Sequence, residues 1–237
     1  MALLSAQDAE QVRKLFATLT KDVHVRLYTQ KLNCPGCADT EAILRELAGL
    51  SDRMKLEVLN AVTDAGQKEA DGVDMVPAMI ISDGTHTRTR IYGTPSGYEF
   101  TTLLTSVMDA GVDSVALETT TIDFLDGLRT DLHFRVFVTP TCPYCPRAAV
   151  LALRMAQKSP HVRADVIEAN EFQSLSSRYR VQGVPRTVVN ERFIAEGAMP
   201  EAAMTAALRR ALELPSDGLE VSLMSLAQPM PPVPEEK

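Results

Sequence analysis

The second half of the chain contains the stretch Leu132-His133-Phe134-Arg135-Val136-Phe137-Val138, which leads to Cys142-Pro143-Tyr144-Cys145 and then to Ala148-Ala149-Val150-Leu151-Ala152-Leu153. The first segment alternates apolar and polar side chains in the manner of a strand, and the last is apolar enough for a buried helix. The two thiols therefore lie where a strand leads into a helix. We expect this arrangement to determine the fold of the chain.

The same arrangement occurs 108 residues earlier in the chain. Val23–Tyr28 alternates like a strand and is followed by Cys34-Pro35-Gly36-Cys37, while Ile43, Leu44, Leu47 and Leu50 repeat at helical spacing. At the same offset Pro77 matches Pro185, each is preceded by valine, and a strand-like run follows each. A duplicated unit is the simplest interpretation.

Each copy is predicted to contain a strand, the cysteine pair, a helix, a second strand, a helix, Val-Pro, a further strand and a last helix. The second strands are expected at Met54–Leu59 and Val162–Ile167, and an extra amphipathic helix precedes each copy. This predicts an α/β fold with units over residues 1–114 and 115–214. The tail, 215–237, is rich in proline and charge, so we expect it to be largely mobile at its end.

The composition excludes several classes of protein. The 237 residues include 24 Lys and Arg against 31 Asp and Glu, a net charge of −7, which argues against a nucleic-acid surface. No run approaches the roughly 18 apolar residues needed to span a bilayer. The apolar run at the N-terminus is too short for the core of a signal peptide. We expect a cytoplasmic protein that binds neither nucleic acid nor membrane.

The four cysteines all belong to the two Cys-x-x-Cys pairs. A thiol at the start of a helix lies beside the positive end of the helix dipole, which stabilises its thiolate. A thiolate attacks a substrate disulfide, and the second thiol then displaces the substrate from the mixed disulfide. Cys34 and Cys142 are therefore predicted to be nucleophiles, and Cys37 and Cys145 to be resolving thiols.

A structural zinc site is the alternative use of four thiols. Zinc ribbons place their pairs some 15 to 20 residues apart, much closer than Cys37 and Cys142. The histidines, which could complete separate sites, are predicted to occupy unrelated positions in the repeat, as polar residues of strands or of the surface. They are His24, His86, His133 and His161.

The repeated Cys-x-x-Cys and Val-Pro resemble those of the two-unit, glutaredoxin-like protein disulfide oxidoreductases of the thioredoxin superfamily, from about Ala6 to Leu214. The resemblance implies two tandem thioredoxin-like units, each a mixed sheet flanked by helices. It also implies cis prolines that face the sulfurs, and substrate backbone that pairs with the preceding valine. The implied substrate-binding residues are Val76, Pro77, Val184, Pro185 and Tyr144.

The two centres are predicted to differ in acidity. The motif around Tyr144 resembles the glutaredoxin sequence, and Arg147 stands where the first copy has Asp39, so Cys142 is expected to be the more acidic nucleophile. The strands before the motifs lack the buried acid of thioredoxins, having Leu27 and Tyr28 or Val136 and Phe137. Proton transfer to the resolving thiols must therefore use another route.

The sequence predicts a protein dithiol–disulfide oxidoreductase that acts on disulfide-containing proteins, with isomerisation as a further activity. A Gly-x-Gly-x-x-Gly fingerprint is absent, so we expect no cofactor, and electrons from a separate flavoprotein that resembles thioredoxin reductase. The alternative is an electron carrier resembling the duplicated N-terminal portion of the flavoprotein that reduces peroxiredoxins. A zinc-held interaction module without turnover remains the third interpretation.

Overall fold

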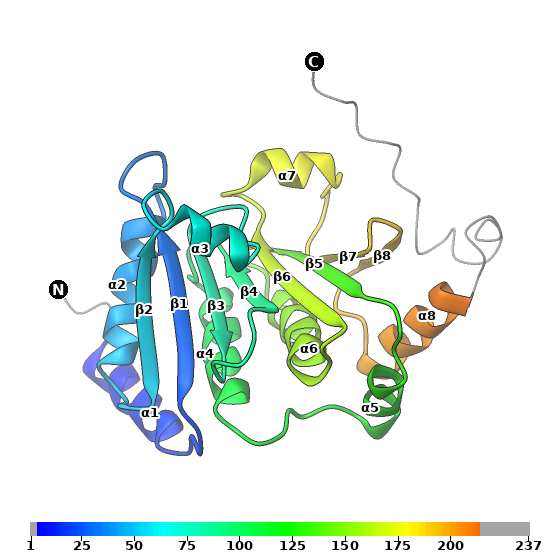
Figure 1. Ribbon diagram of the computed structural model, residues 1–237, viewed down its shortest axis with the longest axis horizontal. Helices are drawn as coiled ribbons and strands as arrows, with labels where there is room; N and C mark the ends of the chain where they lie inside the picture. The colour runs from blue at the N-terminus through cyan, green and yellow to red at the C-terminus, as the bar shows by residue number, and fades with distance from the viewer. Residues whose placement is uncertain (1–3, 214–237) are drawn as a thin grey trace.

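The protein is built around one sheet of eight strands with helices on both faces (Figure 1). The computed structural model describes residues 4–213. The predicted α/β fold of two tandem units, each with strands flanked by helices, is confirmed. The predicted tail, 215–237, lies outside the described residues. None of the helices between residues 4 and 213 is long and apolar enough to cross a bilayer.

The first unit begins with the predicted extra helix, which Ser5 caps by accepting a hydrogen bond from the Asp8 N–H at 3.1 Å. Its strand β1 buries Val23, Val25 and Leu27 and leaves His24 exposed, as the alternating sequence predicts. The elements are α1 (Ala6–Phe16), β1 (Val23–Thr29), α2 (Cys37–Ala48), β2 (Met54–Asn60), α3 (Ala65–Ala70), β3 (Ala78–Ser82), β4 (Thr89–Tyr92) and α4 (Tyr98–Ala110).

The second unit repeats this order. Its elements are α5 (Thr119–Asp126), β5 (Leu132–Val138), α6 (Cys145–Lys158), β6 (Val162–Glu168), α7 (Gln173–Arg178), β7 (Arg186–Val189), β8 (Phe193–Glu196) and α8 (Glu201–Glu213). More side chains are buried on α6 than on α2, as its nearly continuous apolar sequence predicts. This difference reflects the central position of α6, which packs against α4 of the first unit.

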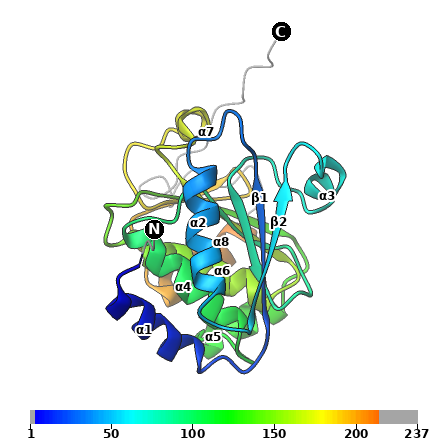
Figure 2. The same cartoon turned by 90° about the vertical axis from the view of Figure 1, so that its left-hand side faces the viewer.

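The two faces of the sheet are covered unequally. The longer helices, together with α5, contribute to one large core, whereas short α3 and α7 lie beside a smaller core on the opposite face, around Tyr28, Tyr92 and Phe137. Figure 2, seen from the β2 edge, shows α2 and α3 on opposite sides of β1 and β2. Much of the second face is therefore free of helices.

Each unit has one more strand than the sequence predicts. The predicted order placed the last helix directly after the Val-Pro strand, and so missed β4 and β8. Both strands are only four residues long. The missed β4 is buried along its whole length, so it shows no alternation that would reveal a strand.

Strand β4 joins the two units, because it pairs in parallel with β6. The resulting order is β2-β1-β3-β4-β6-β5-β7-β8. Strands β1, β4, β6 and β5 run in the same direction, so the carboxyl ends of β1 and β5 lie at the same edge of the sheet. Both cysteine motifs follow those ends, and we call this side of the molecule the redox edge.

The register of the strands corrects the prediction for the histidines. His24 pairs with Lys55 and His133 with Arg163, at equivalent places in the two units. The prediction of unrelated positions is wrong for this pair. The loop between β5 and Cys142 is one residue shorter than the loop between β1 and Cys34. Equivalent residues of β1 and β5 are therefore separated by one residue more than equivalent residues in the rest of the repeat. Within the second unit, His133 Nε2 lies 2.6 Å from Asp165 Oδ2. Asp165 in turn contacts Arg90 of β4 across the junction.

Candidate active site

Each cysteine pair closes its own disulfide at the start of a helix. The Cα atoms are 5.4 Å apart for Cys34 and Cys37, and 5.5 Å apart for Cys142 and Cys145. Cys37 is the first residue of α2 and Cys145 the first of α6, so the predicted position between strand and helix is confirmed. The unpaired N–H groups and positive dipole of each helix start therefore lie beside the sulfurs.

The second centre brings its predicted residues together. Cys142 is 9% exposed and Cys145 is fully buried, so the first sulfur is the one that a partner can reach. The Val184 carbonyl oxygen lies 3.7 Å from Cys142 Sγ, and the peptide bond between Val184 and Pro185 is cis. Tyr144, between the cysteines, is 65% exposed. The Val-Pro pair thus faces the sulfur, as the resemblance implied.

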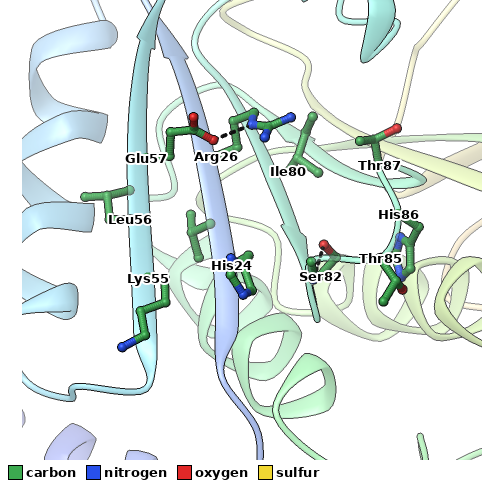
Figure 3. A pocket seen from close by; sticks show the side chains of 12 residues that line it. His24, Arg26, Lys55, Leu56, Glu57, Ile80, Ser82, Thr85, His86 and Thr87 are labelled. Carbon is green, nitrogen blue, oxygen red and sulfur yellow. Dashed lines mark hydrogen bonds and ion pairs between the residues drawn. The ribbon is translucent and has the colours of Figure 1, made fainter. Parts of the chain in front are cut away.

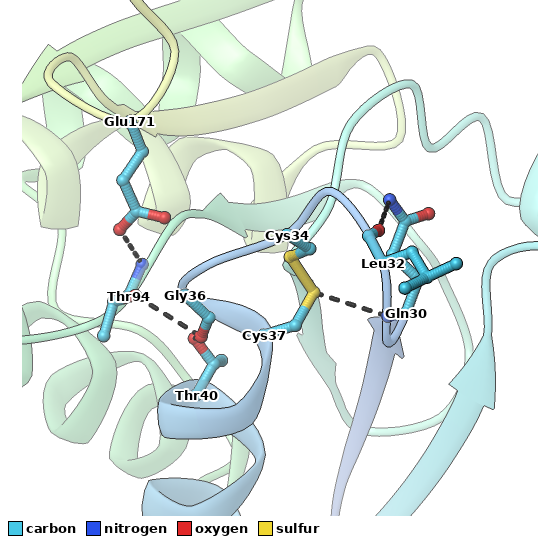
Figure 4. The surroundings of a disulfide bond; sticks show 8 residues. All are labelled: Gln30, Leu32, Cys34, Gly36, Cys37, Thr40, Thr94 and Glu171. Carbon is cyan, nitrogen blue, oxygen red and sulfur yellow. Dashed lines mark hydrogen bonds between the residues drawn. A yellow bond between two sulfur atoms is a disulfide. The ribbon is translucent and has the colours of Figure 1, made fainter.

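The first centre has the same plan with different surroundings (Figure 4). Cys34 is half-buried and Cys37 is buried, and the Gln30 N–H donates a hydrogen bond to Cys37 Sγ at 3.4 Å. The peptide bond between Val76 and Pro77 is cis. Leu32, just before the motif, is 78% exposed. An apolar side chain therefore stands beside this centre on the surface.

A buried carboxyl group that the sequence prediction missed is Glu99, in the first turn of α4. The residue is 2% exposed, and among the described residues neither of its carboxyl oxygens has a hydrogen-bond partner. Burial raises the pKa of Glu99 to about 7, and the neighbouring Glu168 carboxyl adds to the rise. A group with this pKa exchanges protons readily near neutral pH.

The backbone just before Glu99 contacts the loop that leads to the second centre. The N–H of its neighbour Tyr98 donates to the Pro140 carbonyl at 2.9 Å, and Pro140 lies two residues before Cys142. A Cβ on Gly97 would lie 2.3 Å from the same carbonyl oxygen, so only glycine permits this approach. The signal in the sequence was the spacing of Glu99 from Leu103, which places both on the buried face of α4.

The charges beside the two motifs carry a first prediction. Asp39 and Arg147 are exposed third residues of α2 and α6. Because a positive charge stabilises a thiolate, Cys142 is expected to titrate below Cys34. The double substitution Asp39→Arg with Arg147→Asp should narrow or invert the difference. At about 8 Å and a dielectric constant of about 40, one charge contributes about 1 kcal/mol, somewhat under one pKa unit.

The measurement is the pH dependence of iodoacetamide alkylation of Cys34 and Cys142, each in a protein whose other pair is replaced by Ser. The effect should be largest at low ionic strength, because salt screens exposed charges. Unchanged profiles after the exchange would assign the acidity to burial or to residues within the motifs, such as Gly36 and Tyr144.

A separate cavity of about 380 Å³ lies on the face of the sheet opposite α2 (Figure 3). It is lined near the start of β1 by His24 and Lys55, whereas the cysteine motif follows the end of that strand. Its Arg26 pairs with Glu57 and with Asp71, each at 2.7 Å. None of the predicted site residues lines it. Within residues 4–213 no three or more His, Cys, Asp or Glu side chains are grouped to hold a metal ion.

Comparison with known proteins supports the two-unit organisation. The model of the thioredoxin domain family matches residues 132–209. A probable thioredoxin from Archaeoglobus fulgidus is 30% identical over 78 residues, which cover 32% of this chain and 85% of that protein. The crystal structure of a protein disulfide oxidoreductase from Aeropyrum pernix K1 is similar over 90% of this chain and 95% of its own, with a TM-score of 0.81 and 26% identity.

A longer relative matches most of the chain. The F subunit of alkyl hydroperoxide reductase from Escherichia coli (strain K12) is 23% identical over 197 residues, which cover 83% of this chain. The chain spans only about a third of that relative, 36% of its length. The similarity therefore covers parts of both units and leaves the larger part of the relative unmatched.

Proposed function

Because the chain belongs to the thioredoxin family, with two units in tandem, we propose that it is a protein dithiol–disulfide oxidoreductase with two redox centres. The observation that carries the proposal is the pair of disulfides at two helix starts on one edge of one sheet. Such a pair can pass between dithiol and disulfide without any change of fold. The substrates are disulfide-containing proteins.

The reaction at the second centre proceeds in two exchanges. The Cys142 thiolate attacks a substrate sulfur, a mixed disulfide forms, and the substrate disulfide breaks to leave one substrate thiolate. Cys145 then loses its proton and attacks Cys142 Sγ, which releases the second substrate thiolate. Two electrons have passed to the substrate, and Cys142 and Cys145 have closed their disulfide. The first centre carries out the same exchanges through Cys34 and Cys37.

The substrate chain binds beside the Val-Pro pair. Among residues 4–213, neither the Val76 N–H nor the Val184 N–H has a hydrogen-bond partner, although both valines are half-buried. An extended segment that carries the substrate cysteine can supply the missing acceptor. Exposed Tyr144 supplies an aromatic contact next to the reacting sulfur of the second centre. Pro77 and Pro185 hold the two valines in place.

Glu99 takes the proton of Cys145. It lies in the first turn of α4, Cys145 begins α6, and these two helices pack together. A carboxylate with a pKa near 7 accepts a thiol proton more readily than an exposed carboxylate does. The first unit thus supplies the general base for the second centre. Glu99 takes the role that a buried acid in the strand before the motif has in thioredoxins.

Replacing Glu99 by Gln is expected to change the pH dependence of stability. The folded protein holds the Glu99 proton more tightly than the unfolded chain, so wild type loses stability as the pH rises from about 4.5 through 7. The variant is neutral throughout. Its advantage in the free energy of unfolding should be small at pH 5 and grow to at most about 3 kcal/mol at pH 8. Urea denaturation at both pH values measures this.

The same variant tests the general base. The rate at which Cys145 resolves a mixed disulfide on Cys142 should lose its rise near pH 7. Glu10→Gln, which removes one exposed carboxylate on α1, is the matched control. A variant that keeps both the wild-type rate profile and the wild-type dependence of stability on pH would contradict the role of Glu99.

A second candidate function is favoured by the match to the F subunit of alkyl hydroperoxide reductase. In that case the chain carries electrons from a flavoprotein reductase to a peroxiredoxin. Reduction of insulin with dithiothreitol as donor tests the general activity, and peroxide consumption with an added flavoprotein and peroxiredoxin tests the carrier. Failure in both assays, with zinc bound to the purified protein, would favour the zinc-held module.

The proposal also includes the boundary between the units and the compartment of the protein. We set the boundary between the units at residues 114 and 115, in the segment between α4 and α5. We place the protein in the cytoplasm, because all four cysteines belong to exchange motifs and none is left for a structural disulfide. The electron donor is a separate flavoprotein of the thioredoxin-reductase class.

A further inference from the structure

The cysteine motif of the first unit is in contact with a carboxylate of the second. Glu171 follows β6, and its Oε1 accepts a hydrogen bond from the Thr94 N–H at 2.6 Å. Thr94 follows β4, and its hydroxyl donates to the Gly36 carbonyl oxygen at 3.5 Å. Figure 4 shows Glu171, Thr94 and Gly36 beside the disulfide of Cys34 and Cys37. The contact therefore crosses the junction between the units.

The contact of Thr94 and Glu171 with the motif leaves room only for glycine at position 36. A Cβ on Gly36 would lie 2.3 Å from Thr94 Oγ1 and 2.6 Å from Glu171 Oε2. Any larger residue at position 36 would displace one of these groups. The second carboxylate oxygen of Glu171 therefore lies directly over the residue that precedes α2.

Glu171 is anchored by the strand before it. Its backbone N–H donates to Glu168 Oε2 at 2.6 Å, and Asn170 Nδ2 donates to the other oxygen of Glu168 at 2.8 Å. Glu168 is only 4% exposed. On the other side, a Cβ on Gly93 would lie 2.6 Å from Glu168 Cβ. The segment that carries Thr94 thus packs directly on the anchor.

The second centre lacks this contact. In the repeat, Thr63 occupies the position equivalent to Glu171, and Tyr144 the position equivalent to Gly36. Tyr144 is 65% exposed, so no neighbouring unit covers that position. The carboxylate contact therefore distinguishes the first centre from the second.

We propose that Glu171 is a positioning residue of the first redox centre, which holds its motif loop through Thr94 and places a negative charge beside the start of α2. The charge disfavours the thiolate of Cys34, because it opposes the positive end of the helix dipole. The second unit thereby makes the first centre the slower nucleophile. This inference rests on the proposed two-centre function and assigns the centres unequal reactivity.

The test is Glu171→Gln in a protein whose Cys142 and Cys145 are replaced by Ser. Glutamine keeps an acceptor for the Thr94 N–H and removes the charge. The midpoint for iodoacetamide alkylation of Cys34 should fall by about half a pH unit, and the rate near pH 7 should rise about two- to threefold. Glu10→Gln in the same background should leave both unchanged.

The converse background, with Cys34 and Cys37 replaced by Ser, reports on Cys142. Glu171→Gln should shift its midpoint less than it shifts that of Cys34. An unmoved Cys34 midpoint, or an equal shift at Cys142, would overturn the inference. Alkylation requires no substrate disulfide, so this result is independent of insulin reduction, whose absence in wild type would count against the proposed function instead.

Rescue provides the second test. Gly36→Ala should lower the thermal unfolding midpoint and alter Cys34 alkylation, because its methyl group meets Thr94 and Glu171. Adding Thr94→Ala and Glu171→Ala removes both obstacles and should abolish most of the effect of Gly36→Ala. An equal effect in both backgrounds would show that the contact does not position the motif.

Discussion

Replacing Cys142 by Ser is expected to reduce the rate of insulin disulfide reduction, with dithiothreitol as donor, by at least about tenfold. A serine hydroxyl does not ionise near neutral pH and cannot form a disulfide. Cys142 Sγ is also the sulfur that lies 3.7 Å from the Val184 carbonyl, where a substrate chain would bind. The turbidity of precipitating insulin measures the rate.

The matched control is Cys34→Ser, which removes the equivalent thiol of the first centre. Asp39 and Glu171 place negative charge beside the first centre. The loss of the Cys34 thiol should therefore reduce activity less than the loss of the Cys142 thiol. If Cys142→Ser retained more than half of the wild-type rate, the second centre would not be the principal site of reduction. A larger loss for Cys34→Ser would reverse the order of the centres.

Replacing Cys145 by Ser is expected to trap the substrate on the enzyme. Attack by Cys142 remains possible, because Cys142 is the sulfur that a partner can reach and Cys145 is fully buried. The mixed disulfide then persists, since no resolving thiol lies beside it. Mass spectrometry after reaction with a single-disulfide substrate should show a covalent adduct at Cys142.

The adduct should disappear on addition of dithiothreitol, which supplies the missing thiol from solution. Combining Cys145→Ser with Cys34→Ser and Cys37→Ser restricts the measurement to one centre. If this protein forms no adduct with a substrate that wild type reduces, then Cys142 is not the attacking group.

The cysteine motifs and their Val-Pro partners could be predicted because each motif is local in the sequence and recurs at a fixed offset. Cys34 and Pro77 lie far apart in the chain, but the offset that relates them to Cys142 and Pro185 indicates a shared fold. The strand and helix on either side of each motif have clear periods. Prediction succeeded where a residue and its partners belong to the same repeated unit.

Prediction failed where a residue acts across the junction. Strand β4 is short and wholly buried, so its role in joining the units leaves no period in the sequence. Glu99 lies on the buried face of α4, which packs against α6 of the other unit, and Glu171 is an exposed residue in the loop between β6 and α7. Neither has a counterpart in the repeat. Only the packing of one unit against the other gives these carboxylates a function.

The parallel pairing of β4 with β6 also bears on how the chain avoids aggregation while it folds. In a single unit each of these strands would be an outer strand, with a row of unpaired backbone groups open to pairing with another molecule. Duplication places both strands in the interior of one sheet and leaves β2 and β8 as its margins. Until the second half has been synthesised, β4 of a nascent chain is uncovered. The fused arrangement therefore protects against aggregation only once translation has passed β6.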